Sequence, residues 1–541
     1  MISFILQAAV LYLISWACWR LVRRRVVKDD LDNIPGPPSH SFWKGNFSKV
    51  FNRNAWDFNR ELAEQYGSIV KINAFFGDRQ LYVFDPKALH HITVKDQHIY
   101  EETSAFLEGN RIFFGDGLLA TLGEQHRKQR KMLAPVFSIT HMRHMIPVFY
   151  DVAHKLRTAI TTKVADGPQE IDMLRWMTRI ALELIGRSGL GYSFDSLVDD
   201  SDVHPYSVSV KELIPTAFTL FAPRAYLLPT LVKIGTPKFR RLVIDMLPFW
   251  KNLRKLRDIV DISHNTSVKI FEEKKALQEE GEEKLLGQGK DIISILMKAN
   301  IEASSEDRLP DSEVLAQIST LTFAAMDTTS NALSRILHLL ATHPKVQDKL
   351  RAEVKAAREQ GGDLPYDEIS SLPFLDAVCR ETLRLYPPFS NILRTTRQSV
   401  ILPLSTPVKG IDGREMHEIT LPSNTNIIIS VLNSNRDPAL WGPDSYEWKP
   451  ERWLSPLPEA LVNAHIPGIY SHLMTFLGGG RACIGFKFSQ LEMKVVLSVL
   501  VSSFRFLPSD KEIFWEMSNI ASPTVKGGGS APQLPLEVAM V

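Results

Sequence analysis

The stretch Phe476-Leu-Gly-Gly-Gly-Arg-Ala-Cys-Ile-Gly485 determines how the rest of this sequence is interpreted. It places Cys483, one of only 3 cysteines, between glycines and close to an arginine, directly before an apolar run. A thiolate is a soft, strongly donating ligand for iron. Glycines let the backbone turn tightly and approach a flat ligand, and backbone N–H groups can point at the sulfur. The pattern therefore predicts a metal-binding thiolate, and the alternative is a buried structural cysteine in a turn before a helix.

The composition is that of a large globular protein of 541 residues. Its net charge of +2, from 63 basic and 61 acidic side chains, gives no indication of nucleic-acid binding. No long linker or repeat interrupts the body, so we expect one large domain. Cys18 lies in the apolar N-terminal run, which leaves only Cys379 and Cys483 in the body. This usage indicates a reducing compartment without a disulfide framework.

The N-terminal segment predicts a membrane anchor. Residues 1–19 are almost wholly apolar, and about 20 apolar residues span a bilayer as a helix. Positive charge after the apolar run, rather than before it, argues against a cleaved signal peptide. The positive-inside rule then places the N-terminus in the lumen and the body in the cytosol. A cleaved signal peptide or a core helix is the alternative. The basic residues that follow are Arg20, Arg23, Arg24, Arg25 and Lys28.

Two features after the anchor bear on this topology. Ile34-Pro-Gly-Pro-Pro38 predicts an extended, semi-rigid hinge. The sequons Asn46-Phe-Ser48 and Asn265-Thr-Ser267 are acceptors for glycosylation only where the chain is lumenal, so a cytosolic body predicts that neither is modified.

The body reads as mostly helical with a few strands. Stretches 68–72 and 80–84 predict a hairpin around a turn at Gly77-Asp78, and Asp85-Pro86 opens a short helix. Residues 100–120 are aromatic and interrupted by glycines, which predicts a loop.

Three further motifs carry chemistry. Segment 123–135 predicts a helix with His126 and Arg130 on one face. A long helix beginning near Pro310 carries Asp327 and Thr328 in an apolar run, where a buried carboxylate is costly. The Thr hydroxyl can bond back to the carbonyl four residues earlier and distort the helix. Capping or turn use of these polar residues is the alternative.

The third motif is a charged pair before a proline-terminated helix end. Glu381 and Arg384 are three residues apart and so share one helical face. Such a pair alone is weak evidence, because surface helices contain many. Arg452, in Pro450-Glu-Arg-Trp453, supplies a further cation downstream.

Together these motifs, in this order, resemble the cytochrome P-450 superfamily. Arg130 matches its Trp-x-x-x-Arg motif, with His126 in place of Trp. Asp327-Thr328 resembles its oxygen-activation motif, with Ala325 where Gly is common. Its haem-binding signature Phe-x-x-Gly-x-Arg-x-Cys-x-Gly is matched at every fixed position, by Phe476, Gly479, Arg481, Cys483 and Gly485.

The resemblance implies a mainly α fold with small β-sheets. It implies an N-terminal transmembrane helix at 1–22, a basic and Pro-rich hinge at 23–41, and one catalytic domain at 42–541. Haem b (iron protoporphyrin IX) would lie between the Asp327 helix and the Cys483 loop. The roles implied are axial iron ligand for Cys483, proton handling for Asp327 and Thr328, propionate binding for Arg130, His126, Arg394 and Arg481, and a structural triad of Glu381, Arg384 and Arg452.

The resemblance further implies a monooxygenase that inserts one atom of dioxygen into an apolar organic substrate. No flavin-binding segment is evident, so electrons would come from a separate NADPH-cytochrome P-450 reductase, with cytochrome b5 as a further candidate partner. The implied location is the endoplasmic reticulum membrane, crossed once, with the catalytic domain cytosolic. The motif style, including Asn435-Arg-Asp-Pro438, resembles fungal microsomal members. We therefore expect a terpenoid or sterol-like substrate in fungal secondary metabolism. The alternatives are a same-fold hydroperoxide isomerase or dehydratase and a non-catalytic haem sensor or ligand carrier.

Overall fold

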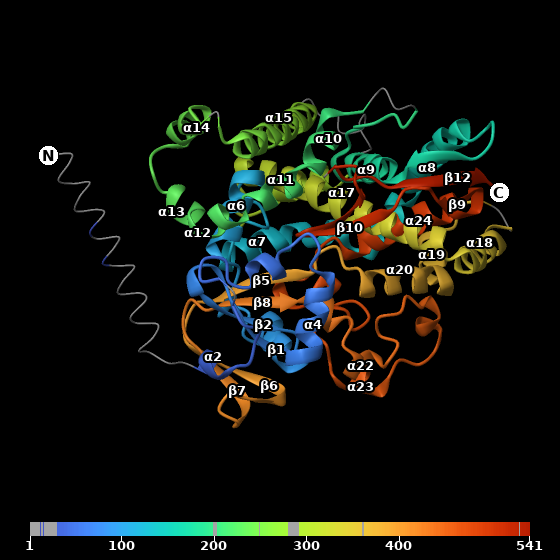
Figure 1. Ribbon diagram of the computed structural model, residues 1–541. Coiled ribbons are helices and arrows are strands. Elements are labelled where there is room, and N and C mark those ends of the chain that lie inside the picture. The colour runs from blue at the N-terminus through green and yellow to red at the C-terminus, as the bar shows by residue number, and fades with distance from the viewer. Residues whose placement is uncertain are drawn as a thin grey trace.

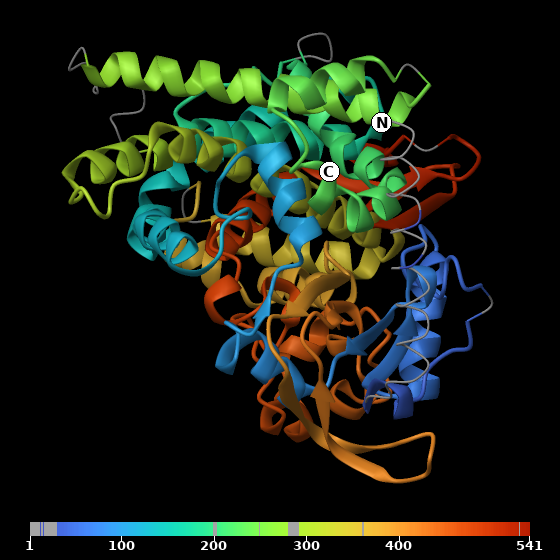
Figure 2. The ribbon, with the colours of Figure 1, turned by 90° about the vertical axis from the view of Figure 1, so that its left-hand side faces the viewer.

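The helical body of the molecule surrounds one long buried helix (Figures 1 and 2). This helix, α17 (Asp311–Thr342), has Asp311 and Glu313 in its first turn, where carboxylates favour the positive helix terminus. Almost every residue from Ala316 to Leu337 is buried, because neighbouring helices pack around it. Its neighbours include α9 (Met173–Leu184), α15 (Lys251–Glu279), α20 (Pro373–Leu385) and α24 (Phe486–Ser503). The computed structural model describes residues 30–39, 41–198, 203–247, 249–279, 291–359, 362–529 and 531–541, together with Leu11 and Ser15.

Shorter helices complete the body. The predicted helix at Gly123 is confirmed, and the one predicted to open at Asp85-Pro86 is capped by the Asp85 side chain, which accepts a hydrogen bond from the N–H of Ala88. The other helices are α2 (Asp30–Asn33), α3 (Phe47–Val50), α4 (Trp56–Tyr66), α5 (Pro86–His90), α6 (Ser104–Phe114), α7 (Gly123–Leu133), α8 (Ile139–Lys163), α10 (Pro205–Lys211), α11 (Leu213–Thr219), α12 (Phe221–Tyr226), α13 (Leu228–Leu231), α14 (Pro237–Asp245), α16 (Ile292–Glu302), α18 (Pro344–Arg358), α19 (Tyr366–Ser371), α21 (Val431–Ser434), α22 (Pro438–Trp441) and α23 (Glu459–Asn463).

Small β-sheets flank the helices, and the largest lies at the lower left of Figure 1. Its strand order is β1-β2-β8-β5-β3, with only β2 and β8 parallel. Ile69 pairs with Val83, which confirms the predicted hairpin. Strand β12 joins β4 and β9 in a second sheet, while β6–β7 and β10–β11 form separate hairpins. The strands are β1 (Ile69–Asn73), β2 (Arg79–Val83), β3 (Tyr100–Glu101), β4 (Gln169–Asp172), β5 (Asn391–Thr396), β6 (Val400–Lys409), β7 (Glu415–Leu421), β8 (Asn426–Ser430), β9 (Phe504–Pro508), β10 (Ile513–Ser518), β11 (Ile520–Val525) and β12 (Pro535–Met540).

The loop predicted at 100–120 is wrong over much of its length. Helix α6 occupies Ser104–Phe114 and is capped by the side chain of Thr103. The glycines favoured a loop in the sequence, yet Gly109 lies buried inside the helix. A Cβ at this position would come 3.0 Å from a terminal guanidinium nitrogen of Arg224. A Cβ here would require the end of the Arg224 side chain to shift by a few tenths of an ångström, a contact that the local sequence does not reveal.

The predicted anchor at 1–22 lies outside the described residues, apart from Leu11 and Ser15. Within the part of the chain that the structure describes, no helix has both the length and the apolar character needed to cross a bilayer. The boundaries at 23–41 and 42–541 stay predictions.

Candidate functional site

The loop that carries Cys483 is shaped by contacts within the protein. The N–H of Cys483 donates to the carbonyl oxygen of Phe476 at 2.9 Å. Gly479 has φ +69°, and an added Cβ would come 1.9 Å from the carbonyl oxygen of Thr93. Gly478 is equally confined by neighbouring backbone. Sequence reasoning assigned these glycines to close approach by a ligand, but packing against the protein backbone already requires them.

The sulfur of Cys483 retains accessible surface although protein surrounds it. Burial raises the pKa of the thiol, while the backbone N–H of Gly485 and the guanidinium of Arg130 act in the opposite direction. An N–H group thus points at the sulfur, as the sequence predicted. A thiol that is both enclosed and accessible faces an internal opening rather than the outer surface.

Beside this loop lie three arginines and a single carboxylate, which pairs with two of them. Terminal guanidinium nitrogens of Arg394, on β5, and Arg481 lie 3.3 Å from the two carboxylate oxygens of Glu102. Among the described residues, Arg130 pairs with no carboxylate; it donates to the carbonyl oxygen of Ala482 at 2.7 Å. Burial lowers the pKa of all three guanidinium groups. The cluster, which we call the Glu102 cluster, holds more positive charge than its own carboxylate balances.

His126 belongs to the Glu102 cluster as a neutral group. Burial, together with the charges of Arg481 and Arg130, lowers its pKa to about 3. The structure therefore brings together all four residues predicted to bind propionates. It adds Glu102, which sequence reasoning missed because a glutamate between a strand and a helix gives no distinguishing signal.

One face of α17 is open. From Ala316 to Leu337, only Ala324, Ala325 and Thr328 are not buried, and their spacing places them on one face of the helix. The hydroxyl of Thr328 donates to the carbonyl oxygen of Ala324 at 2.7 Å, as the motif predicted. This leaves the lone pairs of the Thr328 oxygen available as acceptors on the open side.

Asp327 has a different environment from its neighbour. Its buried carboxylate accepts hydrogen bonds from the ammonium group of Lys211, on α10, at 2.7 Å and from the side-chain amide of Asn331 at 3.2 Å. No described contact joins the Asp327 carboxylate to the Thr328 hydroxyl. The sequence did not indicate Lys211, which lies 116 residues away.

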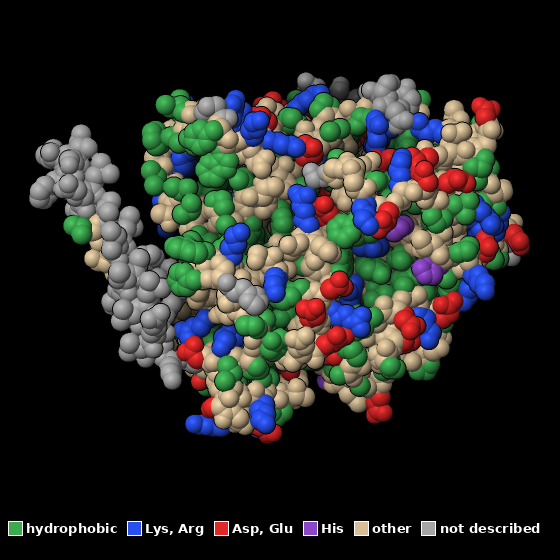
Figure 3. Space-filling view, in the orientation of Figure 1, with side chains coloured by type: hydrophobic (Ala, Val, Ile, Leu, Met, Phe, Trp, Pro, Cys, Tyr) green, Lys and Arg blue, Asp and Glu red, His purple; other side chains and the backbone are tan. Residues whose placement is uncertain are grey.

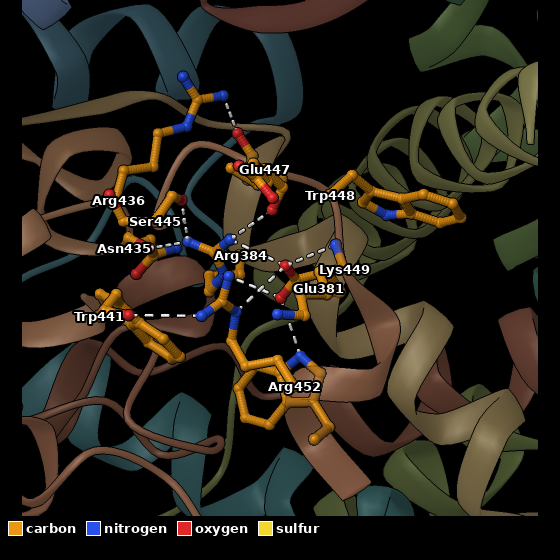
Figure 4. Close-up of polar contacts among 12 residues, drawn as sticks. Glu381, Arg384, Asn435, Arg436, Trp441, Ser445, Glu447, Trp448, Lys449 and Arg452 are labelled. Atoms are coloured by element: carbon orange, nitrogen blue, oxygen red, sulfur yellow. Dashed lines mark hydrogen bonds and ion pairs between the residues drawn. The ribbon is translucent and has the colours of Figure 1, made fainter. Parts of the chain in front are cut away.

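The Glu381 network unites the predicted triad (Figure 4). Arg384 donates to both oxygens of Glu381, at 2.8 and 2.9 Å, and Nε of Arg452 lies 3.4 Å from Oε1. The backbone N–H of Lys449 and the indole N–H of Trp453 also donate to this carboxylate, each at 3.0 Å. The other N–H groups of Arg384 and Arg452 donate to the Asp444 side chain and to backbone carbonyls. These carbonyls belong to Asn435, Trp441, Asp444, Ser445 and Glu447.

Comparisons with known proteins identify the family to which a chain with these motifs belongs. The family model described as "Cytochrome P450" matches residues 35–527. Cytochrome P450 monooxygenase 91 of Postia placenta is 53% identical over 99% of both chains. Ganoderic acid synthetase CYP5150L8 of Ganoderma lucidum is 45% identical over 97% of this chain and 96% of the relative. Cytochrome P450 monooxygenase eriI of Hericium erinaceus is 37% identical over 98% of each.

The chain belongs to the cytochrome P450 family.

The cofactor of cytochrome P450 is haem, whose iron binds a thiolate, and the residues present fit it. Cys483 offers an enclosed but accessible sulfur. Three guanidinium groups and one carboxylate leave two positive charges in the Glu102 cluster, and haem b carries two propionates. The open face of α17 supplies small side chains, as a broad flat ligand requires. Cys483 would hold the iron, and the arginines would hold the propionates.

Proposed function

We propose that this cytochrome P450 oxygenates a terpenoid or sterol-like substrate in fungal secondary metabolism, with electrons from NADPH through a separate reductase. The observation that carries the proposal is the open face of α17, where two alanines lie about one turn before a single hydroxyl. Such a wall suits an apolar molecule with one reacting position. A relative named for ganoderic acid, 45% identical, supports the choice of substrate class.

Bound haem supplies dioxygen activation and electron transfer at the iron, and the chain supplies positioning and protons. Because the Thr328 hydroxyl donates to Ala324, its oxygen accepts a hydrogen bond from a donor at the open face. Asp327 is the nearest carboxylate along the helix, and Lys211 holds it on the other side. Proton delivery by Asp327 therefore requires its carboxylate to exchange Lys211 for a donor or acceptor nearer the open face.

The redox partner is proposed to dock against the exposed side of α7. Arg127, Lys128 and Lys131 lie there, and the side chain of Arg127 is 78% exposed. Arg127 pairs with Glu124, also exposed, so part of this charge is already balanced within the chain. An acidic surface on the reductase, or on cytochrome b5, is the complementary partner.

The proposed location is the endoplasmic reticulum membrane, with the catalytic domain cytosolic. Figure 3 shows hydrophobic side chains gathered over α13 and α14. A water-exposed apolar patch of this kind suits contact with lipid. Exposed members of the patch are Leu227, Leu231, Ile234, Phe239, Leu242, Val243, Met246, Phe249 and Trp250.

The enzyme test combines the holoprotein with reductase, NADPH, dioxygen and a terpenoid and sterol panel, and quantifies products by mass spectrometry. Asp327→Asn should lower turnover on the order of 100-fold, the effect typical of losing a proton-transfer group. Asp311→Asn is the matched control, an exposed carboxylate on the same helix, and should leave turnover unchanged. Products that form without NADPH would instead identify the hydroperoxide isomerase or dehydratase.

Only one of the two sequons can test the membrane topology. The Asn46 side chain is buried and bonded to Pro38 and Asn73, so it cannot carry a glycan in the folded protein. Asn265 is exposed and is the informative position. In a eukaryotic host Asn265 should stay unmodified, and a mass shift reversed by peptide-N-glycosidase would overturn the cytosolic orientation.

A further inference from the structure

The region between α6 and α12 contains a cation that has no acidic partner among the described residues. Arg224, on α12, lies with its guanidinium carbon 5.0 Å from the centre of the Phe113 ring. One terminal nitrogen donates to the carbonyl oxygen of Ala217 at 3.2 Å, and the buried Nε has no partner among the described residues. The side chain is still partly accessible. Burial lowers the pKa of Arg224 to about 10, and no described carboxylate opposes this shift.

Two buried arginines show how the charge of such a group is stabilised elsewhere in the protein. Arg179 forms a two-pronged ion pair with Asp195 at 2.7 Å. Arg335 also lacks an acid, but it is fully enclosed, with its guanidinium 3.6 Å from the Trp515 ring centre and 4.1 Å from that of Tyr386. Aromatic faces therefore stabilise the charge of Arg335, and its buried side chain is not accessible to a ligand. Arg224 has one ring and an accessible edge.

A continuous row of aromatic rings links Arg224 to the open face of α17. Phe113 and Phe114 are neighbours on α6, with ring centres 5.9 Å apart. Phe114 stacks on Phe323 at 4.8 Å, and Phe323 directly precedes Ala324 of the open face. The row of rings thus runs from the guanidinium of Arg224 to the turn of α17 that carries the open face. Gly109 is part of this arrangement, because its lack of a Cβ gives room for the guanidinium.

We infer that Arg224 binds a carboxylate carried by the substrate, at the end remote from the position that is oxidised. This inference rests on the proposed function and narrows its substrate class to acidic terpenoids or sterol-like acids. A guanidinium suits a carboxylate because its N–H groups bind both oxygens at once. One cation balances one negative charge, so a monocarboxylic acid fits better than a phosphate ester.

The test measures binding, not turnover. Equilibrium dialysis compares oleanolic acid and dehydroabietic acid with their methyl esters on the wild-type holoprotein. The immobilised holoprotein is also incubated with the acidic and neutral fractions of a fungal lipid extract, and the retained molecules are identified by mass spectrometry. Wild type should prefer acid to ester by about tenfold or more, the worth of a charge-assisted hydrogen bond, and should retain molecules from the acidic fraction.

Three variants separate recognition from structural roles. Arg224→Gln should lose the preference for acids while keeping its affinity for esters, and Arg224→Lys should keep part of the preference. Arg240→Gln is the matched control, because Arg240 is a partly exposed arginine of α14 whose described hydrogen bonds also go to backbone carbonyls. It should behave as wild type. If Arg224→Gln does not fold, Gly109→Ala, which crowds the guanidinium, should reduce the preference instead.

Several outcomes would overturn the inference. These are equal affinity of wild type for acid and ester, retention of neutral molecules only or of none, and an equal loss of acid and ester binding in Arg224→Gln. A neutral terpenoid that is oxidised with NADPH would overturn this inference and leave the proposed function intact. Acid-selective binding without any NADPH-dependent product would support this inference and overturn the proposed function.

Discussion

The Glu381 network and the Glu102 cluster balance buried positive charge in different ways. In the network, Glu381 pairs with Arg384 and Arg452, Asp444 also pairs with Arg452, and backbone carbonyls accept from the remaining N–H groups. In the cluster, one carboxylate faces two arginines and a third has none. The first arrangement is complete in the polypeptide, and the propionates of bound haem would complete the second. We therefore expect the network to govern folding and the cluster to govern cofactor retention.

Breaking the Glu381 network should have the largest effect on the stability of the fold. Glu381→Gln leaves the buried Arg384 without a described carboxylate partner and Arg452 with Asp444 alone, at a cost of about 3–5 kcal/mol. The free energy of unfolding, from urea denaturation, should fall by this amount, and little holoprotein should accumulate. Glu102→Gln is the matched variant in the cluster and should cost the holoprotein much less, because propionates remain. Equal costs for the two variants would remove the distinction.

Removing a cation from the Glu102 cluster should affect the haem more than the fold. Arg394→Leu should speed haem transfer to excess apomyoglobin by about tenfold or more, through loss of a charge-assisted hydrogen bond. The haem-free protein should be no less stable than wild type, since the change relieves repulsion among uncompensated cations. Arg397→Leu, which removes an arginine paired with Glu101 just after the same strand, should not alter haem transfer. A destabilised haem-free Arg394→Leu would contradict the interpretation.

The pH dependence of the haem-free protein should report on the same cluster. The pKa of His126 is about 3 in the folded chain, below its ordinary value of 6.5. The unfolded state therefore binds the extra proton first, and stability falls as the pH decreases from 6.5 towards 3. Above pH 6.5 His126 does not contribute to the pH dependence of the free energy of unfolding.

Free energies of unfolding of the haem-free protein at pH 5, 6, 7 and 8 test this pH dependence, and the His126→Gln variant is the comparison. The variant should show a shallower decline below pH 6.5. Holoprotein should also show a shallower decline, because propionates offset the charges of Arg130 and Arg481. Identical slopes in wild type and variant would show that His126 does not carry the effect.

The smallest effect is expected at an exposed pair. Arg127 and Glu124 are 78% and 83% exposed, so solvent already screens their attraction. Arg127→Gln should leave both unfolding and haem transfer unchanged. It should slow reduction by the NADPH-dependent reductase at low ionic strength and not at high, as stopped-flow measurements can show. A salt-independent rate would argue against docking at α7.

Much of this arrangement could be predicted where the determining contacts are local or fixed by a motif. The Thr328 bond to Ala324 spans four residues, and Glu381 and Arg384 lie one helical turn apart. Distant partners could not be predicted in this way. Lys211 reaches Asp327 only because α10 packs beside α17, and no local pattern in the sequence specifies that contact.

The helix at Ser104–Phe114 illustrates the same limit. Sequence reasoning gave weight to Gly109 as a loop residue, whereas the structure buries it against Arg224. The conformational preference of glycine is a local property, but the reason for its presence lies more than a hundred residues away. Glu102 was missed for a related reason, since only the fold brings Arg394 and Arg481 to it.

The confinement of Gly479 has a consequence for the order of assembly. Its contact with the Thr93 backbone and the bond from Cys483 to Phe476 fix the shape of the loop within the polypeptide. The conformational entropy of this segment is therefore lost during folding rather than on haem entry. The cofactor meets a pre-organised sulfur, so its binding energy is not diverted into ordering the chain.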